Sequence, residues 1–599
     1  MEMYLMSFRR ILGCKAAQNA ARCCWAPVVG MALVGALIGV FTPLSLQAQS
    51  ATPAGDSVSA LGSGNAAAVP TGLQPIAGSA TQFLEDGAAL EQTRQWGEAL
   101  SVYQQAIKKF PADEQLQQRR AVARIHFDLD RRYSDSSFVS SVESTDAATA
   151  LNIYAEVLLK IQSYYVDEPN WADLASYGLT SLEVALLSPE FRKINLPQAN
   201  DALIKATILS TRERLSRVVV NNRHDAYIVA SSTAKSLQET LGLNVQATTY
   251  EFVCGAISAL DPYSAYMSDN QFSETMSQIE GNFVGLGVEL RTHTDYLEIV
   301  SVIPGGSAGQ GGLVKGDRIT SVDQQSVTTI GSEKAADLLR GPEESFVTLS
   351  LDRGHGPQTL RLERRRVEIP SVDQVSIVDT QAGVGYIRLT NFQKTTARDF
   401  DAALWQLHRE GMRSLIVDVR GNPGGLLSAS VEVADRFVNS GIIVSTRGRN
   451  PMEDYTHRAN AASTWRVPLV VLVDENSASA SEIFAAAIHD HERGTIVGHQ
   501  SYGKGSVQGI FPLNVSGGGV RLTTAKFYSP RGDAISEVGV AADVVVQESA
   551  KFDLNLEAGE DNGLRVGIQT ARRAVVGQPA VPANAIGLTT IPQSKMAER

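Results

Sequence analysis

Three polar residues in the last third of the chain have types and spacing that suit hydrolysis. Ser479 lies in the stretch NSASASE, directly before an apolar segment that predicts a helix, and Lys504 stands between two glycines. A serine hydroxyl becomes a nucleophile when a nearby base takes its proton, and a lysine kept neutral by burial can be that base. Because a lysine in water titrates near ~10.4, the site has to lower the pKa of Lys504 by several units. Gln508 follows four residues later, which we expect to place its carbonyl on the same side of a strand, where it can orient the amine.

Backbone N–H groups beside Ser479 can stabilise the oxyanion that attack on a carbonyl produces. The first N–H groups of a helix have no partner within that helix, so Ala480 can offer one donor. Gly424 and Gly425 follow another apolar strand, SLIVDV, and the strands of one layered core end at a shared edge. We therefore predict an oxyanion hole formed by the amide of Ala480 and the turn at Gly424 and Gly425.

Each of these residues also has a purely structural interpretation. Ser479 and Glu482 match the capping box S-x-x-E, in which the serine caps a helix and has no further role. The two glycines at 424 and 425 can simply form the turn after a strand. Lys504 can be a solvated surface cation. The local sequence leaves these alternatives open.

Histidines and a glycine-rich loop near Ser479 suggest other chemistry. His489 and His491 are two residues apart on a predicted helix, so their rings face different sides and do not favour a shared metal. Any of His489, His491 and His499 could serve as the base in place of the lysine. Residues 498–504 match the first seven positions of GxxxxGK, but Gly505 replaces the required Ser or Thr and a strand follows. We expect no nucleotide, metal or other cofactor.

The segment at 371–548 alternates apolar strands with amphipathic helices. SLIVDV and PLVVLVD are short buried strands, and the helix carrying Ser479 follows the second of them. This alternation predicts an α/β layered core. Beyond about residue 549 the apolar pattern fades, and we expect a mobile tail over 549–599.

Residues 281–367 read as a small β-rich domain whose order of elements resembles a PDZ domain. The resemblance rests on the stretch GLGV at 285–288, on Gly316 and Asp317, and on the later helix and strand. It implies that Gly285, Leu286, Gly287 and Val288 bind the terminal carboxylate and the backbone of a peptide tail. Glycine allows such a close backbone approach, although the same glycines also suit a tight turn.

The first half of the chain is mostly helical. Residues 148–275 carry amphipathic stripes, and residues 81–133 resemble a tetratricopeptide (TPR) repeat covered by a further helix. The alternative is an ordinary helical hairpin. A TPR-like segment would offer a docking surface for an adaptor protein. Residues 50–80 are rich in Ala, Gly, Ser, Thr and Pro, which indicates a flexible linker.

Residues 1–49 predict export as a signal peptide or membrane anchor. Basic residues precede an uncharged apolar run at 26–49, which is typical of a signal peptide and is also long enough to stay as a membrane anchor. In both cases the bulk of the chain lies outside the cytoplasm, periplasmic or facing the cell exterior. A net charge of -11 argues against nucleic-acid binding, and four cysteines over 599 residues form no disulfide framework.

Together, NSASASEI, GKGSVQ, DVRGNPGG, TTAKFYSPRG and LDPYSAYM resemble the carboxyl-terminal processing peptidases, the tail-specific proteases of family S41. The resemblance implies a crotonase/ClpP-like α/β core, with Ser479 as nucleophile, Lys504 as base and Gln508 orienting the base. It also implies a PDZ domain that recruits the free C-terminal tails of polypeptide substrates. Family members often have Asn where Gly421 stands and Gly-Arg-Ala where residues 492–494 are Glu-Arg-Gly.

The sequence therefore predicts a serine endopeptidase that cleaves exported or unfolded proteins near their C-termini. Two other functions remain open. The chain could be a non-catalytic PDZ/TPR scaffold that retains a protease-like core, or a serine hydrolase of small esters. An intact set of Ser479, Lys504 and Gln508 favours the peptidase.

Overall fold

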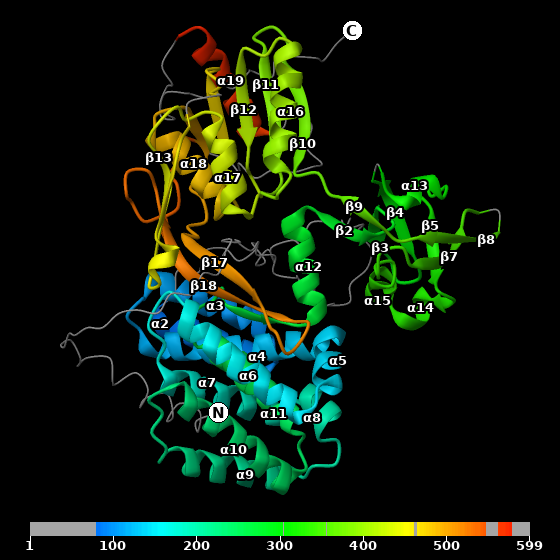
Figure 1. The fold of residues 1–599 in the computed structure, drawn as a ribbon, viewed down its shortest axis with the longest axis vertical. Helices are drawn as coiled ribbons and strands as arrows, with labels where there is room; N and C mark the ends of the chain where they lie inside the picture. Colours follow the sequence, from blue (N-terminus) through cyan, green and yellow to red (C-terminus); the bar gives the residue numbers. More distant parts are fainter. Residues whose placement is uncertain (1–78, 304, 355, 461–463, 547–560, 578–599) are drawn as a thin grey trace, which may run out of the picture.

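The computed structural model describes residues 79–303, 305–354, 356–460, 464–546 and 561–577. Figure 1 shows three parts: a helical region, a small β-rich domain that stands to one side, and an α/β body. The apolar run predicted as a signal peptide or anchor at 26–49 lies outside the described residues, as does nearly all of the predicted linker at 50–80. Within the described ranges, no helix combines the length and apolar character needed to cross a membrane.

The first part is helical, as the sequence predicts. Several of its helices begin at an Asp or Asn whose side chain accepts N–H groups of the first turn, for example at Asp113 and Asp146. Helix α11 is buried on nearly every side, and its Gly255 lets it lie against the backbone of α7. The helices are α2 (Ala80–Gln92), α3 (Trp96–Lys109), α4 (Glu114–Ser134), α5 (Ser136–Ser144), α6 (Ala147–Tyr164), α7 (Trp171–Leu187), α8 (Pro189–Asn195), α9 (Asp201–Leu215), α10 (Arg223–Leu241) and α11 (Val245–Ser258).

The segment read as TPR-like forms the antiparallel pair α2 and α3, with α4 packed against them. Gly87 allows the two helices to touch, because a Cβ at this position would lie 2.3 Å from the ring of Tyr103. Phe83, Tyr103 and Leu116 belong to a separate apolar cluster. The helical hairpin and its covering helix are confirmed, while its identity as a TPR repeat remains a prediction.

The second part forms its own sheet and core. Its strands have the order β3-β4-β5-β7-β8, and β6 pairs with β5. The core lies between this sheet and the short helices. The elements are β3 (Val288–Thr292), β4 (Leu297–Val302), α13 (Ser307–Gln310), β5 (Arg318–Val322), β6 (Gln325–Ser326), α14 (Val327–Ile330), α15 (Ser332–Asp337), β7 (Phe346–Asp352) and β8 (Pro357–Glu363).

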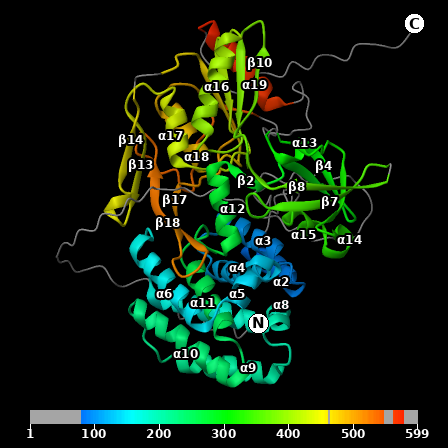
Figure 2. The same cartoon turned by 45° about the vertical axis from the view of Figure 1, so that its right-hand side comes forward.

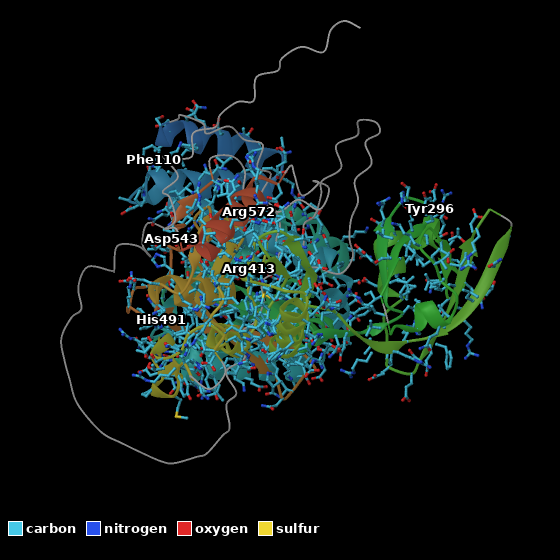
Figure 3. All side chains as sticks on the ribbon, turned by 90° about the horizontal axis from the view of Figure 1, so that it is seen from above. Phe110, Tyr296, Arg413, His491, Asp543 and Arg572 are labelled. Atoms are coloured by element: carbon cyan, nitrogen blue, oxygen red, sulfur yellow. The ribbon has the colours of Figure 1, made fainter. Side chains whose placement is uncertain are left out.

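This domain joins the rest through a narrow connection. Helix α12 (Asp269–Glu280) leads into β2 (Asn282–Gly285), which pairs antiparallel with the exit strand β9 (Arg365–Glu368). Seen from above, the domain carrying Tyr296 stands to the side of the body that carries Arg413 and Arg572 (Figure 3). The domain therefore contacts the body mainly through its two linking strands and α12.

The third part is an α/β body built on the sheet β10-β11-β12-β15-β16-β19. All neighbouring pairs are parallel except β10 with β11. Strands β12 and β15 are buried along their whole length, which explains their continuous apolar sequence. The elements are β10 (Val372–Asp379), β11 (Val384–Leu389), α16 (Thr396–Arg409), β12 (Ser414–Asp418), α17 (Leu427–Asp435), β15 (Leu469–Val473), α18 (Ala480–Asp490), β16 (Thr495–Gly498) and β19 (Val544–Val545).

The prediction of a mobile tail over 549–599 is wrong for residues 561–577. This segment contains helix α19 (Asn562–Val575), red in Figure 1, which packs against β11, β12, β15 and β16. It covers the sheet face opposite α17 and α18, where Leu564 and Ala571 join a second apolar cluster. Gly567 permits the close approach, because a Cβ there would lie 2.9 Å from Leu472. Its buried residues Leu564, Gly567 and Ala571 recur at helical spacing, a signal that the prediction of a mobile tail overlooked.

A second sheet connects the body to the helical region. Its order is β1-β18-β13-β14, and β17 pairs with β18. The hairpin of β17 and β18 extends from the body onto the helices (Figures 1 and 2). Its Leu513, Val520 and Leu522 are part of the core of the helical region. The elements are β1 (Ala265–Met267), β13 (Ile442–Gly448), the 3-10 turn η1 (Pro451–Glu453), β14 (Tyr455–Arg458), β17 (Ser506–Pro512) and β18 (Gly519–Tyr528).

Candidate active site

Ser479 lies at the N-terminus of α18, after the buried strand β15. Its backbone has φ 56° and ψ -112°, an uncommon conformation for a residue with a Cβ, and strain of this kind concentrates at functional sites. The residue is 1% exposed, and its Oγ is buried without a hydrogen-bond partner among the described residues. A helix-capping role alone would engage this oxygen.

Lys504 lies in the loop just before β17 and is 3% exposed, so the interpretation as a solvated surface cation is wrong. Burial, and after it the nearby charge of Arg521, lower the pKa of its amine to about 7, although Glu482 and Asp261 act in the opposite direction. Its Nζ lies 5.2 Å from the ring centre of Tyr263, which belongs to the LDPYSAYM stretch. Near neutral pH a large fraction of this lysine is therefore an uncharged amine.

Glu482 joins the backbones of Ser479 and Lys504, whereas the Ser479 hydroxyl makes no hydrogen bond to the lysine. Its Oε2 accepts the N–H of Ser479 at 2.8 Å and the N–H of Lys504 at 2.9 Å. Its Oε1 accepts the N–H of Gly503 and the hydroxyl of Ser501, each at 2.6 Å. One fully buried carboxylate therefore fixes the start of α18 against the lysine loop. Burial raises the pKa of Glu482, and these four hydrogen bonds oppose the rise.

The sequence does not predict this role of Glu482. It suggests only that the residue is the second half of a capping box. The only available signal was a glutamate in the middle of an apolar segment, SEIFAAAI. A charged residue in such a position is seldom fully buried without partners.

Gln508 is fully buried on β17. Its Nε2 donates to Ser506 Oγ at 2.8 Å, and its Oε1 is buried without a hydrogen-bond partner among the described residues. The expectation that Lys504 and Gln508 share one side of a strand is wrong in detail, because Lys504 precedes the strand and a bulge interrupts the pairing between Val507 and Gln508.

The glycine turn packs directly against Ser479, as the shared-edge argument predicts. A Cβ at Gly424 would lie 2.8 Å from the Cβ of Ser479 and 3.0 Å from the nitrogen of Ala480. Gly424 and Gly425 have φ of 111° and 138°, values that suit glycine. The N–H of Gly424 donates to Asn422 Oδ1 at 2.9 Å, whereas the N–H groups of Ala480 and Gly425 have no acceptor among the described residues. Gly424 thus supplies the close approach, and Ala480 and Gly425 supply the free donors.

The stretch at 285–288 enters the edge strand of the small domain. Strand β3 begins at Val288 and pairs on one side only, with β4. The carbonyls of Leu286 and Gly287 accept the N–H groups of Ala308 and Ile303 at 2.9 and 2.8 Å, which fixes the loop before the strand. Leu286 is buried in the domain core, and Gly287 has φ 79°. The outer edge of β3 can pair with an added strand.

The three histidines near Ser479 have separate partners. His491 Nε2 lies 2.7 Å from the carbonyl of Ile442, and His499 Nε2 lies 2.7 Å from that of Val546. His489 contacts Asp490 instead, with 3.0 Å between Nδ1 and Oδ1. In the described ranges no group of three or more His, Cys, Asp and Glu side chains is arranged for a metal ion.

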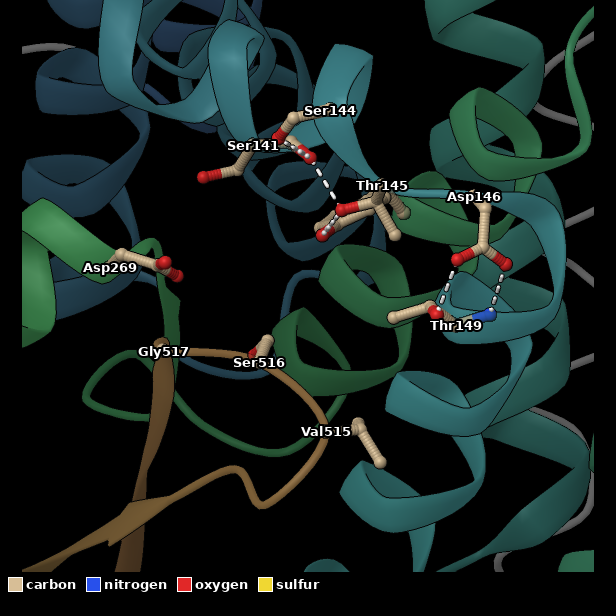
Figure 4. Close-up of a pocket in the computed structure, with 10 residues that line it drawn as sticks. Ser141, Ser144, Thr145, Asp146, Thr149, Asp269, Val515, Ser516 and Gly517 are labelled. Carbon is tan, nitrogen blue, oxygen red and sulfur yellow. Dashed lines mark hydrogen bonds between the residues drawn. The ribbon is translucent and has the colours of Figure 1, made fainter.

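A small polar pocket lies elsewhere, between α5, α6 and the turn that joins β17 to β18 (Figure 4). Its volume is about 200 Å³, and none of the predicted site residues lines it. Asp146 on its wall accepts from Thr149 and caps α6. This pocket is therefore distinct from the Ser479 site.

Comparison with protein-family models matches residues 383–546 to peptidase family S41 and residues 298–353 to the PDZ domain. The first match spans the strands and helices that carry Ser479, Lys504 and the glycine turn. The second covers most of the small β-rich domain, which confirms the predicted PDZ domain.

Named relatives agree with this assignment. The carboxy-terminal-processing protease of Bartonella bacilliformis is 34% identical over 340 residues, which cover 55% of this chain and 77% of the relative. The carboxyl-terminal-processing protease of a Synechocystis species is 33% identical over 50% of this chain and 71% of its own length. A solved photosystem II D1 C-terminal processing protease is 24% identical over 71% of this chain and 98% of that chain, with a TM-score of 0.37. The chain therefore belongs to the carboxy-terminal-processing proteases, serine peptidases of family S41.

Proposed function

We propose that Ser479 and Lys504 form the catalytic pair of this peptidase and that Gln508 orients the lysine. The observation that carries the proposal is the shared carboxylate of Glu482, which fixes the backbones of both residues while Lys504 is buried with its pKa lowered to about 7. A neutral amine and a buried hydroxyl in this arrangement suit nucleophilic catalysis without a metal or nucleotide.

In the proposed reaction, the Nζ of neutral Lys504 takes the hydroxyl proton as Ser479 Oγ adds to the substrate carbonyl. The N–H groups of Ala480 and Gly425 stabilise the oxyanion. The lysine ammonium then gives its proton to the departing amine, and an ester on Ser479 remains. Lys504 next activates a water molecule, which hydrolyses the ester and regenerates the serine.

We further propose that the PDZ domain recognises the free C-terminal tail of a polypeptide substrate. The one-sided pairing of β3 and the fixed loop at 285–288 support this, since a tail can extend the sheet while backbone N–H groups bind its carboxylate. The apolar run at 26–49 supports export to the periplasm or cell exterior, with or without a retained membrane anchor. The pair α2 and α3 would offer the docking surface for an adaptor protein.

Replacement of each catalytic residue tests the first proposal. We expect Ser479→Ala and Lys504→Ala each to abolish cleavage of an unstructured protein, with circular dichroism and thermal unfolding showing that both variants stay folded. Cleavage at the wild-type rate in either folded variant would contradict the mechanism. If the wild-type chain binds peptides but does not cleave them, the result would favour the non-catalytic scaffold.

Matched substrates test the second proposal. One peptide ends in a free carboxylate and its partner ends in an amide, with the same sequence otherwise. We expect the amide to be cleaved about 10-fold less efficiently, because the loop at 285–288 loses its charged ligand. Equal cleavage of both peptides would contradict tail recognition, and faster hydrolysis of a small ester than of either peptide would favour the esterase.

A further inference from the structure

Behind the glycine turn, a guanidinium is completely buried between two carboxylates. Arg420 is 1% exposed, and both its Nη1 and its Nη2 donate to the carboxylate of Asp561, at 2.9 and 2.8 Å. On its other side, Nη2 donates to Asp418 at 2.6 Å and Nε at 3.0 Å. Asp418 also accepts the hydroxyl of Tyr386 at 2.8 Å.

Arg420 is the first residue of the turn that reaches Ser479. The next residue, Gly421, donates its N–H to Asp474 at 3.0 Å. The carbonyl of Asn422 then accepts the N–H of Ala478 at 3.1 Å and the hydroxyl of Ser481 at 2.9 Å, on either side of Ser479. The path from Arg420 to the proposed oxyanion donors is therefore short, and hydrogen bonds at Gly421 and Asn422 hold it.

Asp561 comes from a distant part of the chain. It caps α19, where its Oδ1 accepts the N–H of Leu564 at 2.9 Å. Burial raises the pKa of Asp561, but the hydrogen bond and charge of Arg420 outweigh burial and keep that pKa below its usual value.

The family model ends at residue 546, so α19 lies beyond the matched peptidase core. Helix α19, red in Figure 1, packs against β12 and β15, the strands that precede the 420–425 turn and α18.

We propose that Asp561 is a positioning residue of the active site, which through Arg420 holds the 420–425 turn where the Gly425 N–H meets the oxyanion. The proposal rests on the proposed function of Ser479 and Lys504. A buried guanidinium that loses one of its two carboxylates is strongly disfavoured and moves toward other partners. Because Arg420 and the turn are continuous, that movement displaces the oxyanion donors. Helix α19 thus completes the site instead of only covering the sheet.

Asp561→Asn separates this role from the folding of α19. Asparagine caps a helix about as well as aspartate, so the start of α19 is preserved. Its side chain, however, has no negative charge and cannot accept both guanidinium N–H groups of Arg420 through two oxygens. The matched control is Arg572→Ala, which removes the other ion pair that ties α19 to the sheet, to Asp379, without contacting Arg420.

The full chain carrying each change is assayed for peptide cleavage, with hydrogen exchange reporting on α19. We expect Asp561→Asn to lower kcat at least about 10-fold with KM within about twofold of wild type, as loss of an oxyanion donor does. We expect Arg572→Ala to keep kcat within about twofold. The amides of α19 should remain protected in both variants.

Two results would overturn the proposal: wild-type kcat in Asp561→Asn, or an equal loss in both variants accompanied by exchange throughout α19. The second result would reduce Asp561 to a structural cap. Failure of the proposed function is recognised separately, because cleavage would then survive in Ser479→Ala whatever Asp561 does.

Discussion

At the scale of single residues, four hydrogen bonds meet at the carboxylate of Glu482 and join the helix of Ser479 to the loop of Lys504. Glutamine at this position keeps the shape but offers one acceptor oxygen, and its amide nitrogen faces donors. Each buried donor left without an acceptor costs about 1–3 kcal/mol.

We therefore expect Glu482→Gln to lower the free energy of unfolding by roughly 2–4 kcal/mol and the cleavage rate by more than about 10-fold. Denaturant unfolding and peptide cleavage measure the two effects. Glu280→Gln is the control, since this partly exposed carboxylate pairs with Lys394 and should cost less than about 1 kcal/mol. Wild-type stability and rate in Glu482→Gln would show that the carboxylate does not organise the site.

The sequence indicates which residue types can do the chemistry, but not how they are held. Ser479 and Lys504 were found because a nucleophile at a helix N-terminus and a lysine between glycines are local patterns. The lowered pKa of Lys504 comes first from burial and then from the charge of Arg521, which reaches it from another segment. Such burial is a property of tertiary packing, which no local pattern encodes.

At the scale of elements, the turn after β12 and the start of α18 fit together only because Gly424 has no side chain. A Cβ there would lie 2.7 Å from the carbonyl of Ala478 and 2.8 Å from the Cβ of Ser479, and φ is 111°. The neighbouring Gly421 also has positive φ, at 68°, but a Cβ there meets nothing within 4 Å.

This contrast predicts different outcomes for two alanine substitutions. Gly424→Ala should push the turn away from Ser479 and reduce cleavage at least about 100-fold, as loss of an oxyanion-hole donor does. Gly421→Ala should cost only the left-handed backbone strain, about 1–2 kcal/mol, and retain most of the activity. Steady-state kinetics measure the activity of both variants, and thermal unfolding measures their stability. Equal activity in the two would mean that the close approach at Gly424 is irrelevant.

The buried strands of the body were predicted, and α19 was not. Strands β12 and β15 are continuous apolar runs that could only be buried, and α18 follows a clear cap. In α19, Leu564, Gly567 and Ala571 do recur at helical spacing, but the small residues on this face do not indicate by themselves which surface they cover. The ion pair that holds α19 to Arg420 joins residues 141 positions apart in the sequence, so no local pattern predicts it.

At the scale of the whole molecule, two of the three parts share a core. Leu513, Val520 and Leu522 of the β17 and β18 hairpin pack among the N-terminal helices, and the N–H of Val166 donates to Thr523 at 2.8 Å. The PDZ domain instead has its own cluster and connects through β2, β9 and α12.

We expect calorimetry to show two unfolding transitions, one for the PDZ domain and one for the helical region with the α/β body. Replacement of residues 286–364 by a short flexible linker between β2 and β9 should remove one transition and shift the midpoint of the other by less than about 3 °C, because the deleted residues belong to a separate core. Collapse of the remaining transition would show that the PDZ domain is part of a single cooperative unit.

The pH dependence of kcat/KM tests the central claim most directly, because it reports the protonation state of the proposed base in the free enzyme. The neutral amine is the active form and the pKa of Lys504 is lowered to about 7, so wild-type kcat/KM should rise as pH increases through about 7 and then level off. Lys504→Arg keeps a positive charge that cannot be lost at these pH values, so its kcat/KM should stay below about 1% of wild type at every pH. Substantial cleavage by Lys504→Arg, or a wild-type profile that is flat from pH 6 to 8, would contradict the assignment of Lys504 as the general base.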